Sequence, residues 1–301
     1  MSIWPAKILP TPFPIPDPFS HFPFSHFHSG TRAAAPCSNC NTPGRTRSRV
    51  LLPPTTAGSK NLEKRPGTVL AIARWQMPRR PRALCGGYVF HVMNRAARRL
   101  PLFSSPEDYE AFDQVLCEAG DRVPMRLLDY AGMPTHFHLV LWPRADSDLS
   151  RYMQRLTMVH VQRWHKARGT TGCGTLYQGR FKAIPVQADG HFLRLCRYVE
   201  RNPVRGGLVN LPTEWPWGSA YRRQRGGGPR LDEWPIAIPH GWTDLVAEVE
   251  APASIEEIRE CLRLGRPFGA EHWCVETAER LPWCCGLRPR GRPPGSKTQL
   301  K

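Results

Sequence analysis

The sequence predicts an α+β fold: a ferredoxin-like (RRM-like) antiparallel sheet with helices on one face, and a small helical extension at the C-terminus. Between residues 87 and 202, short segments of alternating apolar residues are interspersed with longer segments of helical periodicity. Their order, β-α-β-β-α-β-α, is that of a split βαβ unit with one added helix. The first 83 residues show neither pattern and hold fourteen of the thirty-two prolines, so we expect the fold to begin after them.

The N-terminal segment, residues 1–83, contains twelve Lys and Arg residues but only two acids. Proline removes a backbone donor and restricts φ, which disfavours both a helix and a strand ladder. We expect this segment to be disordered. We also expect the working protein to begin at Met77, after translated upstream sequence, because Pro-Arg-Arg-Pro-Arg leads from Met77 directly into the first strand.

The first strand is predicted at residues 87–94, where apolar side chains alternate between two faces. Ser105-Pro-Glu-Asp then indicates a helix start, with Ser as N-cap, Pro in the first turn and acids near the positive end of the helix dipole. Gly120 is predicted to end this helix. Its apolar stripe comprises Tyr109, Phe112, Val115 and Leu116.

A hairpin and a second helix follow. Residues 124–131 and 135–142 alternate like strands and are joined by a Gly-Met-Pro turn. Residues 148–165 have helical periodicity. The two histidines of this predicted helix, His160 and His165, are expected at its surface or at its end.

The predicted domain, residues 84–225, closes with a strand at 180–186 and a helix at 190–202, which Pro203 ends. Residues 226–301 differ in character. Gly226-Gly-Gly-Pro indicates a linker, and Ser254-Ile-Glu-Glu has the pattern of a capping box that opens a short helix. A further helix is predicted at 270–281, followed by a basic, proline-rich tail.

The chain has 301 residues and a formal charge of +17. Such an excess of Lys and Arg favours a polyanionic partner, above all nucleic acid. Of the ten cysteines, only Cys37 and Cys40 have ligand-like spacing, and no second pair follows. No apolar run is long enough to span a bilayer and no signal peptide is visible, so we expect a cytoplasmic, nucleoid-associated protein without a membrane partner.

Four residues have the pattern of a metal-assisted nucleophilic site. His136 and His138 flank Phe137 on a predicted strand, so their imidazoles share one face. Tyr198 and Asn202 are four apart on a predicted helix and share a face as well. We expect His136, His138 and Asn202 to hold Mg²⁺ or Mn²⁺, and Tyr198 to attack a phosphodiester.

A phenol titrates near pH 10, so a tyrosine nucleophile needs a metal, a positive field or a base. Four arginines surround Tyr198 in the sequence and are expected to supply that field and to bind phosphates: Arg194, Arg197, Arg201 and Arg205. Either Tyr198 or Asn202 alone would be read as a core or helix-end residue.

Taken together, these residues resemble the REP-associated tyrosine transposases, which are single-tyrosine HUH transposases. The resemblance covers residues 84–225 and rests on four segments in order: Met133-Pro-Thr-His-Phe-His-Leu-Val-Leu, Leu176-Tyr-Gln-Gly-Arg-Phe-Lys, Arg197-Tyr-Val-Glu-Arg-Asn-Pro-Val-Arg-Gly-Gly-Leu-Val and Trp215-Pro-Trp-Gly-Ser-Ala. It departs from the family at Thr135, where Asn is usual.

The resemblance implies a DNA strand transferase, active in DNA transposition and recombination, that cleaves and rejoins single-stranded hairpin DNA. His136 and His138 match the HUH metal ligands, and Asn202 stands at the third ligand position. Tyr198 matches the nucleophile, which becomes joined to a DNA 5′-phosphate and leaves a free 3′-hydroxyl. Family members act as monomers or homodimers.

Further DNA contacts are expected outside this set. In Tyr177-Gln-Gly-Arg-Phe-Lys, the basic residues Arg180 and Lys182 alternate with aromatic residues. This pattern favours contacts with phosphates and stacking on nucleic-acid bases. In the tail, Arg290 and Arg292 flank a glycine as in an AT-hook, which indicates contact with the minor groove of AT-rich duplex DNA.

Two alternatives belong to other classes. One is a domesticated protein that binds hairpin DNA without cutting it; a complete set of His136, His138, Tyr198 and Asn202 argues against it. The other is a His-x-His metallohydrolase on a barrel, which would need more strands and more ligands than the chain contains.

Overall fold

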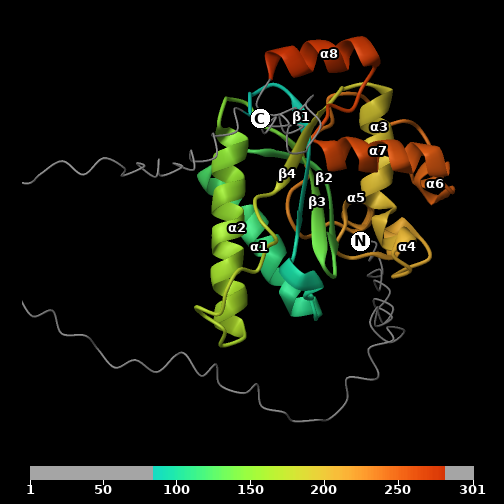
Figure 1. Ribbon diagram of the computed structural model, residues 1–301. Helices are drawn as coiled ribbons and strands as arrows, with labels where there is room; N and C mark the ends of the chain where they lie inside the picture. The colour runs from blue at the N-terminus through green and yellow to red at the C-terminus, as the bar shows by residue number, and fades with distance from the viewer. Residues whose placement is uncertain (1–83, 282–301) are drawn as a thin grey trace, which may run out of the picture. The chain divides into compact units, whose positions relative to one another are not determined.

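A computed structural model describes residues 84–281 (Figure 1). The predictions of a disordered N-terminal segment, of a start at Met77 and of an AT-hook at Arg290 and Arg292 lie outside these residues. Among the helices that are described, none is both long enough and apolar enough to cross a membrane.

The sheet has four strands in the order β2-β3-β1-β4, and all neighbours are antiparallel. This is the strand order of a split βαβ unit, so the predicted α+β fold class is confirmed. The strands are β1 (Val89–Arg95), β2 (Arg126–Met133), β3 (His136–Trp142) and β4 (Lys182–Val186).

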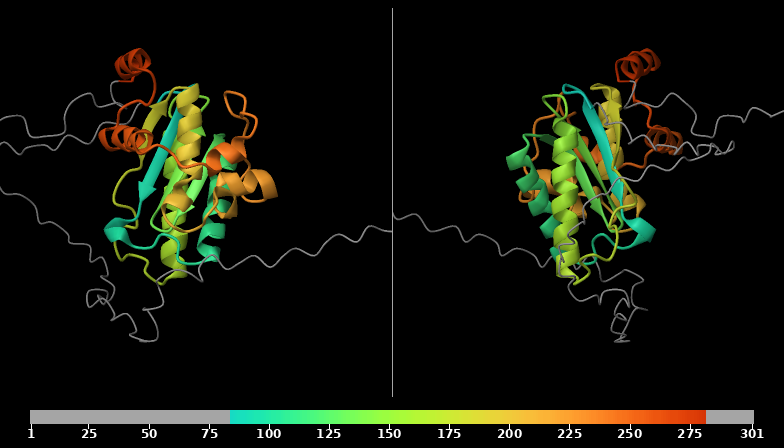
Figure 2. Two further views of the ribbon diagram at one scale, coloured as in Figure 1. Left: turned by 90° about the vertical axis from the view of Figure 1, so that its right-hand side faces the viewer. Right: turned by 60° about the vertical axis from the view of Figure 1, so that its left-hand side comes forward.

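One face of the sheet is covered by α1 (Pro106–Arg122) and α2 (Asp148–Ala167), as predicted (Figure 2). Successive strand residues point to opposite faces, and the residues that meet these helices are apolar: Phe90, Val92, Leu127, Phe137, Leu139 and Leu141. Helix α1 continues past Gly120, the predicted end, and stops at Arg122. A glycine inside a helix is tolerated, so the C-cap prediction was wrong.

The other face of the sheet is covered by helices as well. The prediction that helices cover one face is therefore correct for α1 and α2, but the sheet has helices on both faces. Here α3 (Gly190–Glu200) and α4 (Asn202–Arg205) pack on the sheet. The predicted helix over 190–202 divides at Arg201, because Pro203 has no N–H and occupies the first turn of α4. The buried residues of this layer include Val89, Val140, Ile184, Phe192 and Leu195.

The segment after residue 225 continues this second layer. The Trp234 indole N–H donates to the Leu128 carbonyl (2.9 Å), and the side chains of Ile258 and Leu262 are buried in the same cluster. Short 3-10 helices occupy Ala97–Arg99 and Pro212–Glu214. The remaining helices are α5 (Ser219–Arg225), α6 (Trp242–Ala247), α7 (Pro252–Leu264) and α8 (Glu271–Arg280).

The predicted capping box at Ser254 is wrong. Helix α7 begins at Pro252, with Ala251 as N-cap, so Ser254 lies inside its first turn. The Ser254 hydroxyl accepts hydrogen bonds from the guanidinium of Arg194 on α3 (3.1 and 3.3 Å). The Ser254 side chain therefore makes a tertiary contact and does not form the helix cap that the local sequence predicted.

Candidate active site

The two predicted imidazoles lie at the start of β3, in the middle of the sheet. In the antiparallel register, His138 pairs with Met93 of β1, and His136 pairs with Arg95. Both side chains line one pocket, and the His138 side chain is buried. Their rings lie edge to face, with centroids 5.1 Å apart.

The same pocket receives the two predicted residues of the helical segment. Tyr198 comes from α3, and its ring lies edge-on to that of His138 with centroids 5.8 Å apart. Asn202 begins α4 and also lines the pocket. The pocket has a volume of about 400 Å³. The structure therefore brings together the four residues that the sequence singled out.

A third histidine, His91, supports His138 and was not singled out by any local sequence pattern. It lies on β1, is completely buried, and stacks on the His138 ring at 5.1 Å. A hydrogen bond of 2.8 Å joins His91 Nε2 to His138 Nδ1. Burial lowers the pKa of His91 to about 3, so this ring is neutral at neutral pH.

The nitrogens that face the pocket determine whether the site suits a metal. Nδ1 of His138 is engaged by His91, and Nδ1 of His136 lies 3.2 Å from the Thr135 hydroxyl. Nε2 of each ring is then the atom left for a ligand. The Asn202 side-chain nitrogen is buried without a hydrogen-bond partner among the described residues, as is Nδ1 of His91.

No three His, Cys, Asp or Glu side chains among residues 84–281 gather closely enough to hold a metal ion. A site here would therefore consist of two imidazoles and the amide of Asn202. Burial, and then the charge of Arg95, lowers the pKa of His136 to about 4; burial also holds the pKa of His138 well below its usual range. Both rings are neutral at pH 7, the state that binds metal, so the residues fit such an ion.

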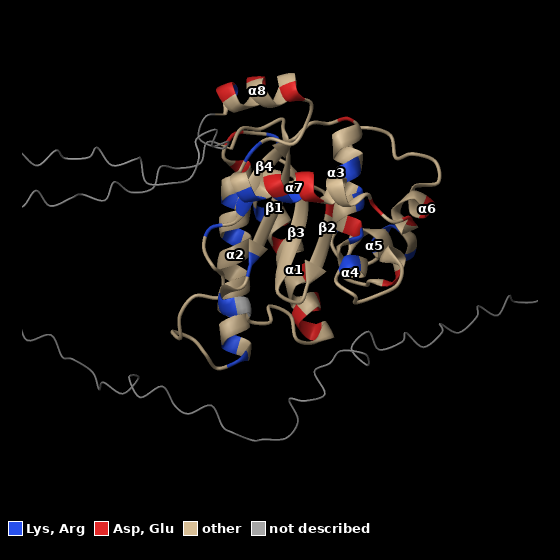
Figure 3. Ribbon diagram, turned by 45° about the vertical axis from the view of Figure 1, so that its right-hand side comes forward, with Lys and Arg blue, Asp and Glu red and all other residues tan. Residues whose placement is uncertain are grey.

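The four arginines around Tyr198 are engaged by the C-terminal segment. Arg194 forms an ion pair with Glu257, and Arg197 donates to the Glu248 carbonyl (3.0 Å). Arg201 is buried and donates to the carbonyls of Val246 and Ala247 (2.7 and 2.6 Å), and Arg205 forms an ion pair with Glu250. Figure 3 shows α7, with its acidic and basic residues, beside α3.

Through its guanidinium, Arg205 also contacts the predicted nucleophile. Its guanidinium carbon lies 4.2 Å from the centroid of the Tyr198 ring. It also donates to the Tyr198 backbone carbonyl. Arg205 therefore contributes to the positive field expected at Tyr198.

The remaining predicted DNA contacts are divided between two locations. Lys182 lines the Tyr198 pocket, whereas Arg180 is exposed at a separate groove of about 850 Å³ beside α2. Tyr177 is buried and its hydroxyl lies 2.6 Å from His160 Nδ1, so it is not available to stack on a base. His160 is buried too, and its predicted position at the surface was wrong.

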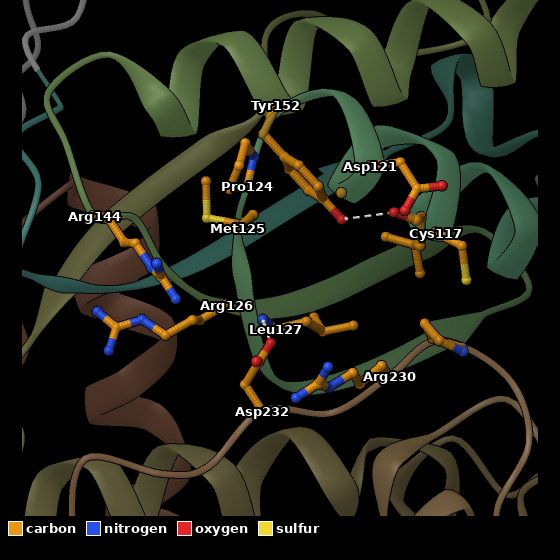
Figure 4. A pocket seen from close by; sticks show the side chains of 13 residues that line it. Cys117, Asp121, Pro124, Met125, Arg126, Leu127, Arg144, Tyr152, Arg230 and Asp232 are labelled. Carbon is orange, nitrogen blue, oxygen red and sulfur yellow. Dashed lines mark hydrogen bonds between the residues drawn. The ribbon is translucent and has the colours of Figure 1, made fainter.

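A further pocket, of about 340 Å³, lies where β2 begins and β3 ends (Figure 4). Figure 4 shows Arg126 beside Arg144 on one side, and Asp232 accepts from the Leu127 backbone N–H (3.0 Å). None of the predicted site residues lines this pocket. The predicted catalytic and metal-binding residues line the Tyr198 pocket instead.

Comparison with known proteins gives the following likenesses. Residues 86–202 match the family model described as "Transposase IS200 like". The REP-associated tyrosine transposase of Escherichia coli (strain K12) is 24% identical over 143 residues, which are 46% of this chain and 78% of that protein.

Two solved structures are also similar. One is a REP-associated tyrosine transposase bound to a REP hairpin, with 20% identity, a TM-score of 0.40, and coverage of 52% of this chain and 93% of that one. The other is a putative transposase from Deinococcus radiodurans R1, with 16% identity, a TM-score of 0.29, and coverage of 38% and 88%.

Proposed function

We propose that this chain is a REP-associated tyrosine transposase and that it cleaves and rejoins single-stranded hairpin DNA through Tyr198. The observation that carries the proposal is the meeting of Tyr198 with His136, His138 and Asn202 in one pocket. A protein that only bound hairpins would have no need of this constellation.

The proposed reaction is a transesterification. The Tyr198 phenolate oxygen attacks the phosphorus of a phosphodiester and forms a new O–P bond, while the bond to the 3′-oxygen breaks. The phenol proton is lost before or during attack, and the departing 3′-oxygen takes up a proton to become a hydroxyl. The reverse step, with another 3′-hydroxyl as nucleophile, rejoins the strand and releases Tyr198.

The residues around Tyr198 have separate tasks. Arg205 lies over the phenol ring at 4.2 Å and places a positive charge beside the nucleophile. Lys182 and Arg95 line the pocket and would attract the phosphate. His91 holds His138 by the hydrogen bond to Nδ1 and so orients its Nε2 toward the pocket.

We further propose that Nε2 of His136, Nε2 of His138 and the side-chain oxygen of Asn202 hold Mg²⁺ or Mn²⁺. Such an ion, when bound, would polarise the phosphodiester. For Nε2 of His138 to present a lone pair, its Nδ1 must carry the proton and donate to His91 Nε2. His91 is then protonated at Nδ1, the atom that has no partner among the described residues.

The proposed substrate is a hairpin that folds from a repeat flanking the gene, in keeping with the REP hairpin bound by a similar protein. The net charge of +17 favours such a polyanion. Contact of the exposed Arg180 with the same DNA is part of this proposal.

A cleavage assay tests the proposal. Labelled single-stranded hairpin DNA from these repeats is incubated with the protein and Mg²⁺ or Mn²⁺, beside Tyr198→Phe and an EDTA control. We expect a covalent protein–DNA adduct that needs the metal and is absent in Tyr198→Phe. Tight hairpin binding without an adduct, over several flanking repeats, would favour the domesticated binder.

A further inference from the structure

Helix α7 contributes side chains to the Tyr198 pocket. Arg259, Leu262 and Arg263, all from α7, line the pocket together with the four predicted site residues. This helix lies beyond residue 202, where the match to the transposase family model ends. The pocket is thus completed by a segment outside the matched domain.

The lining of the pocket is cationic. Among the described residues that form its wall, four carry positive charge and none carries a carboxylate: Arg95, Lys182, Arg259 and Arg263. Positive charges that converge on a cavity favour an anion within it. Half of this charge comes from α7.

The position of α7 is fixed by contacts on two sides. On its apolar side, Ile258 and Leu262 are buried in the core layer shared with α3 and β4. On its polar side, Arg194 of α3 binds both the Ser254 hydroxyl and the Glu257 carboxylate.

The connection that leads into α7 is held as well. Its Glu250 carboxylate is buried and forms ion pairs with Arg201 (3.5 Å) and Arg205. The arginines predicted to bind DNA therefore anchor the segment that brings two other arginines to the pocket.

Arg259 and Arg263 themselves are exposed and have weak partners. Arg259 lies 3.9 Å from Glu256, and the two side chains are 54% and 69% exposed. Arg263 lies 3.4 Å from Glu260, with exposures of 66% and 53%. Such exposed pairs within one helix contribute little to stability, so a DNA phosphate readily replaces the carboxylate.

We propose that Arg259 and Arg263 form the outer phosphate-binding wall of the active site, and that Arg194 acts through α7 as a positioning residue. This inference rests on the proposed function, since it takes single-stranded DNA as the anion. The two guanidiniums would bind backbone phosphates beside the scissile one. The α3 arginines would keep α7 over the pocket.

The first test measures binding separately from cleavage. Arg259→Ala/Arg263→Ala is made in the Tyr198→Phe background, and its affinity for a fluorescein-labelled hairpin oligonucleotide with a single-stranded flank is measured over a salt series. Arg144→Ala, which removes an exposed arginine at the pocket of Figure 4, is the matched control.

We expect the double variant to bind about tenfold or more weakly. The plot of log K against log salt has a negative slope, and we expect its steepness to decrease by about 1.4, since each lost contact to a single strand accounts for about 0.7. Arg259→Lys/Arg263→Lys should retain most of the salt dependence. Affinity equal to that of Arg144→Ala, or higher than that of the parent, would overturn the proposal.

The second test is a double-mutant cycle that separates positioning from direct contact. Arg194→Ala should weaken binding in the parent but have little further effect once Arg259 and Arg263 are alanine. Fully additive losses would mean that Arg194 contacts DNA itself and would overturn its positioning role. Failure of the wild type to form an adduct, with binding still dependent on Arg259 and Arg263, would refute the cleavage function and leave this inference standing.

Discussion

His138 is held by a neighbouring imidazole, and this contact is open to a direct test. His91→Phe keeps a ring against His138 but removes the hydrogen bond to its Nδ1. Loss of such a supporting bond typically lowers metal affinity about 10–100-fold. We expect that loss for Mn²⁺ in titration calorimetry, whereas the exposed His240→Asn should bind Mn²⁺ like the wild type. Equal affinities of His91→Phe and wild type would contradict this role.

His160 gives a prediction about acid stability. Burial lowers the pKa of His160 to about 3, whereas an unfolded histidine titrates near 6.5. Because the folded-state pKa is the lower one, its stabilisation is present above pH 6.5 and is lost as pH falls toward 3. The loss is about 1.4 kcal/mol per pH unit for one such group.

His160→Gln keeps a polar partner for Tyr177 but cannot titrate. Urea unfolding at several pH values between 6 and 4.5 should show a shallower loss of stability for the variant than for the wild type, by about 1 kcal/mol per pH unit. Parallel curves would mean that His160 does not set the pH dependence.

At this scale the sequence predicts what local periodicity determines. The two-residue repeat of a strand identifies His136 and His138, and the four-residue repeat of a helix identifies Tyr198 and Asn202. His91 joins them only through the register of β1 against β3, which pairs His91 with Val140 and Met93 with His138. No local pattern contains that register.

At the scale of elements, one buried carboxylate joins two of the arginines of α3 and α4 to the C-terminal segment. The Glu250 side chain is 5% exposed and forms ion pairs with Arg201 and Arg205. Glu250→Ala would leave both cations without it, and loss of one partner of a buried pair costs about 3–5 kcal/mol.

Glu248→Ala is the control for this prediction. The Glu248 side chain is 68% exposed and lies 3.7 Å from Arg197, so its removal should cost less than about 1 kcal/mol. Thermal melts should therefore show a large decrease for Glu250→Ala and a small one for Glu248→Ala. Similar decreases for the two variants would contradict the central position of Glu250.

Between residues 87 and 202 the order and type of the elements follow from the sequence, whereas their caps and partners do not; α5 and α6 were not predicted. The strand and helix periods predicted the sheet and its first three helices. Ser254 has the residues of a capping box but bonds with Arg194 instead. The second face is covered by α3 and α4, and the later part of that layer comes from Trp234, Ile258 and Leu262, which lie beyond a glycine-rich segment. Such long-range packing is not visible in local sequence patterns.

At the scale of the whole molecule, the proposed metal site predicts a linkage between binding and folding. A ligand that binds only the folded state adds about 2.7 kcal/mol at a hundredfold excess over its Kd. For a domain of this size that corresponds to a rise in Tm of about 5–10 °C. We expect Mn²⁺ to give this rise in the wild type and none in His138→Ala; an equal rise in both would exclude His138 as a ligand.

The central claim is that Tyr198 becomes covalently joined to DNA, and mass spectrometry of the trapped adduct tests it most directly. The protein is incubated with hairpin DNA and Mn²⁺, the adduct is digested with nuclease and protease, and the modified peptide is sequenced. We predict a nucleotide attached through its 5′-phosphate to Tyr198, and no adduct from Tyr198→Phe. A nucleotide on another residue, or an equal adduct from Tyr198→Phe, would contradict the account.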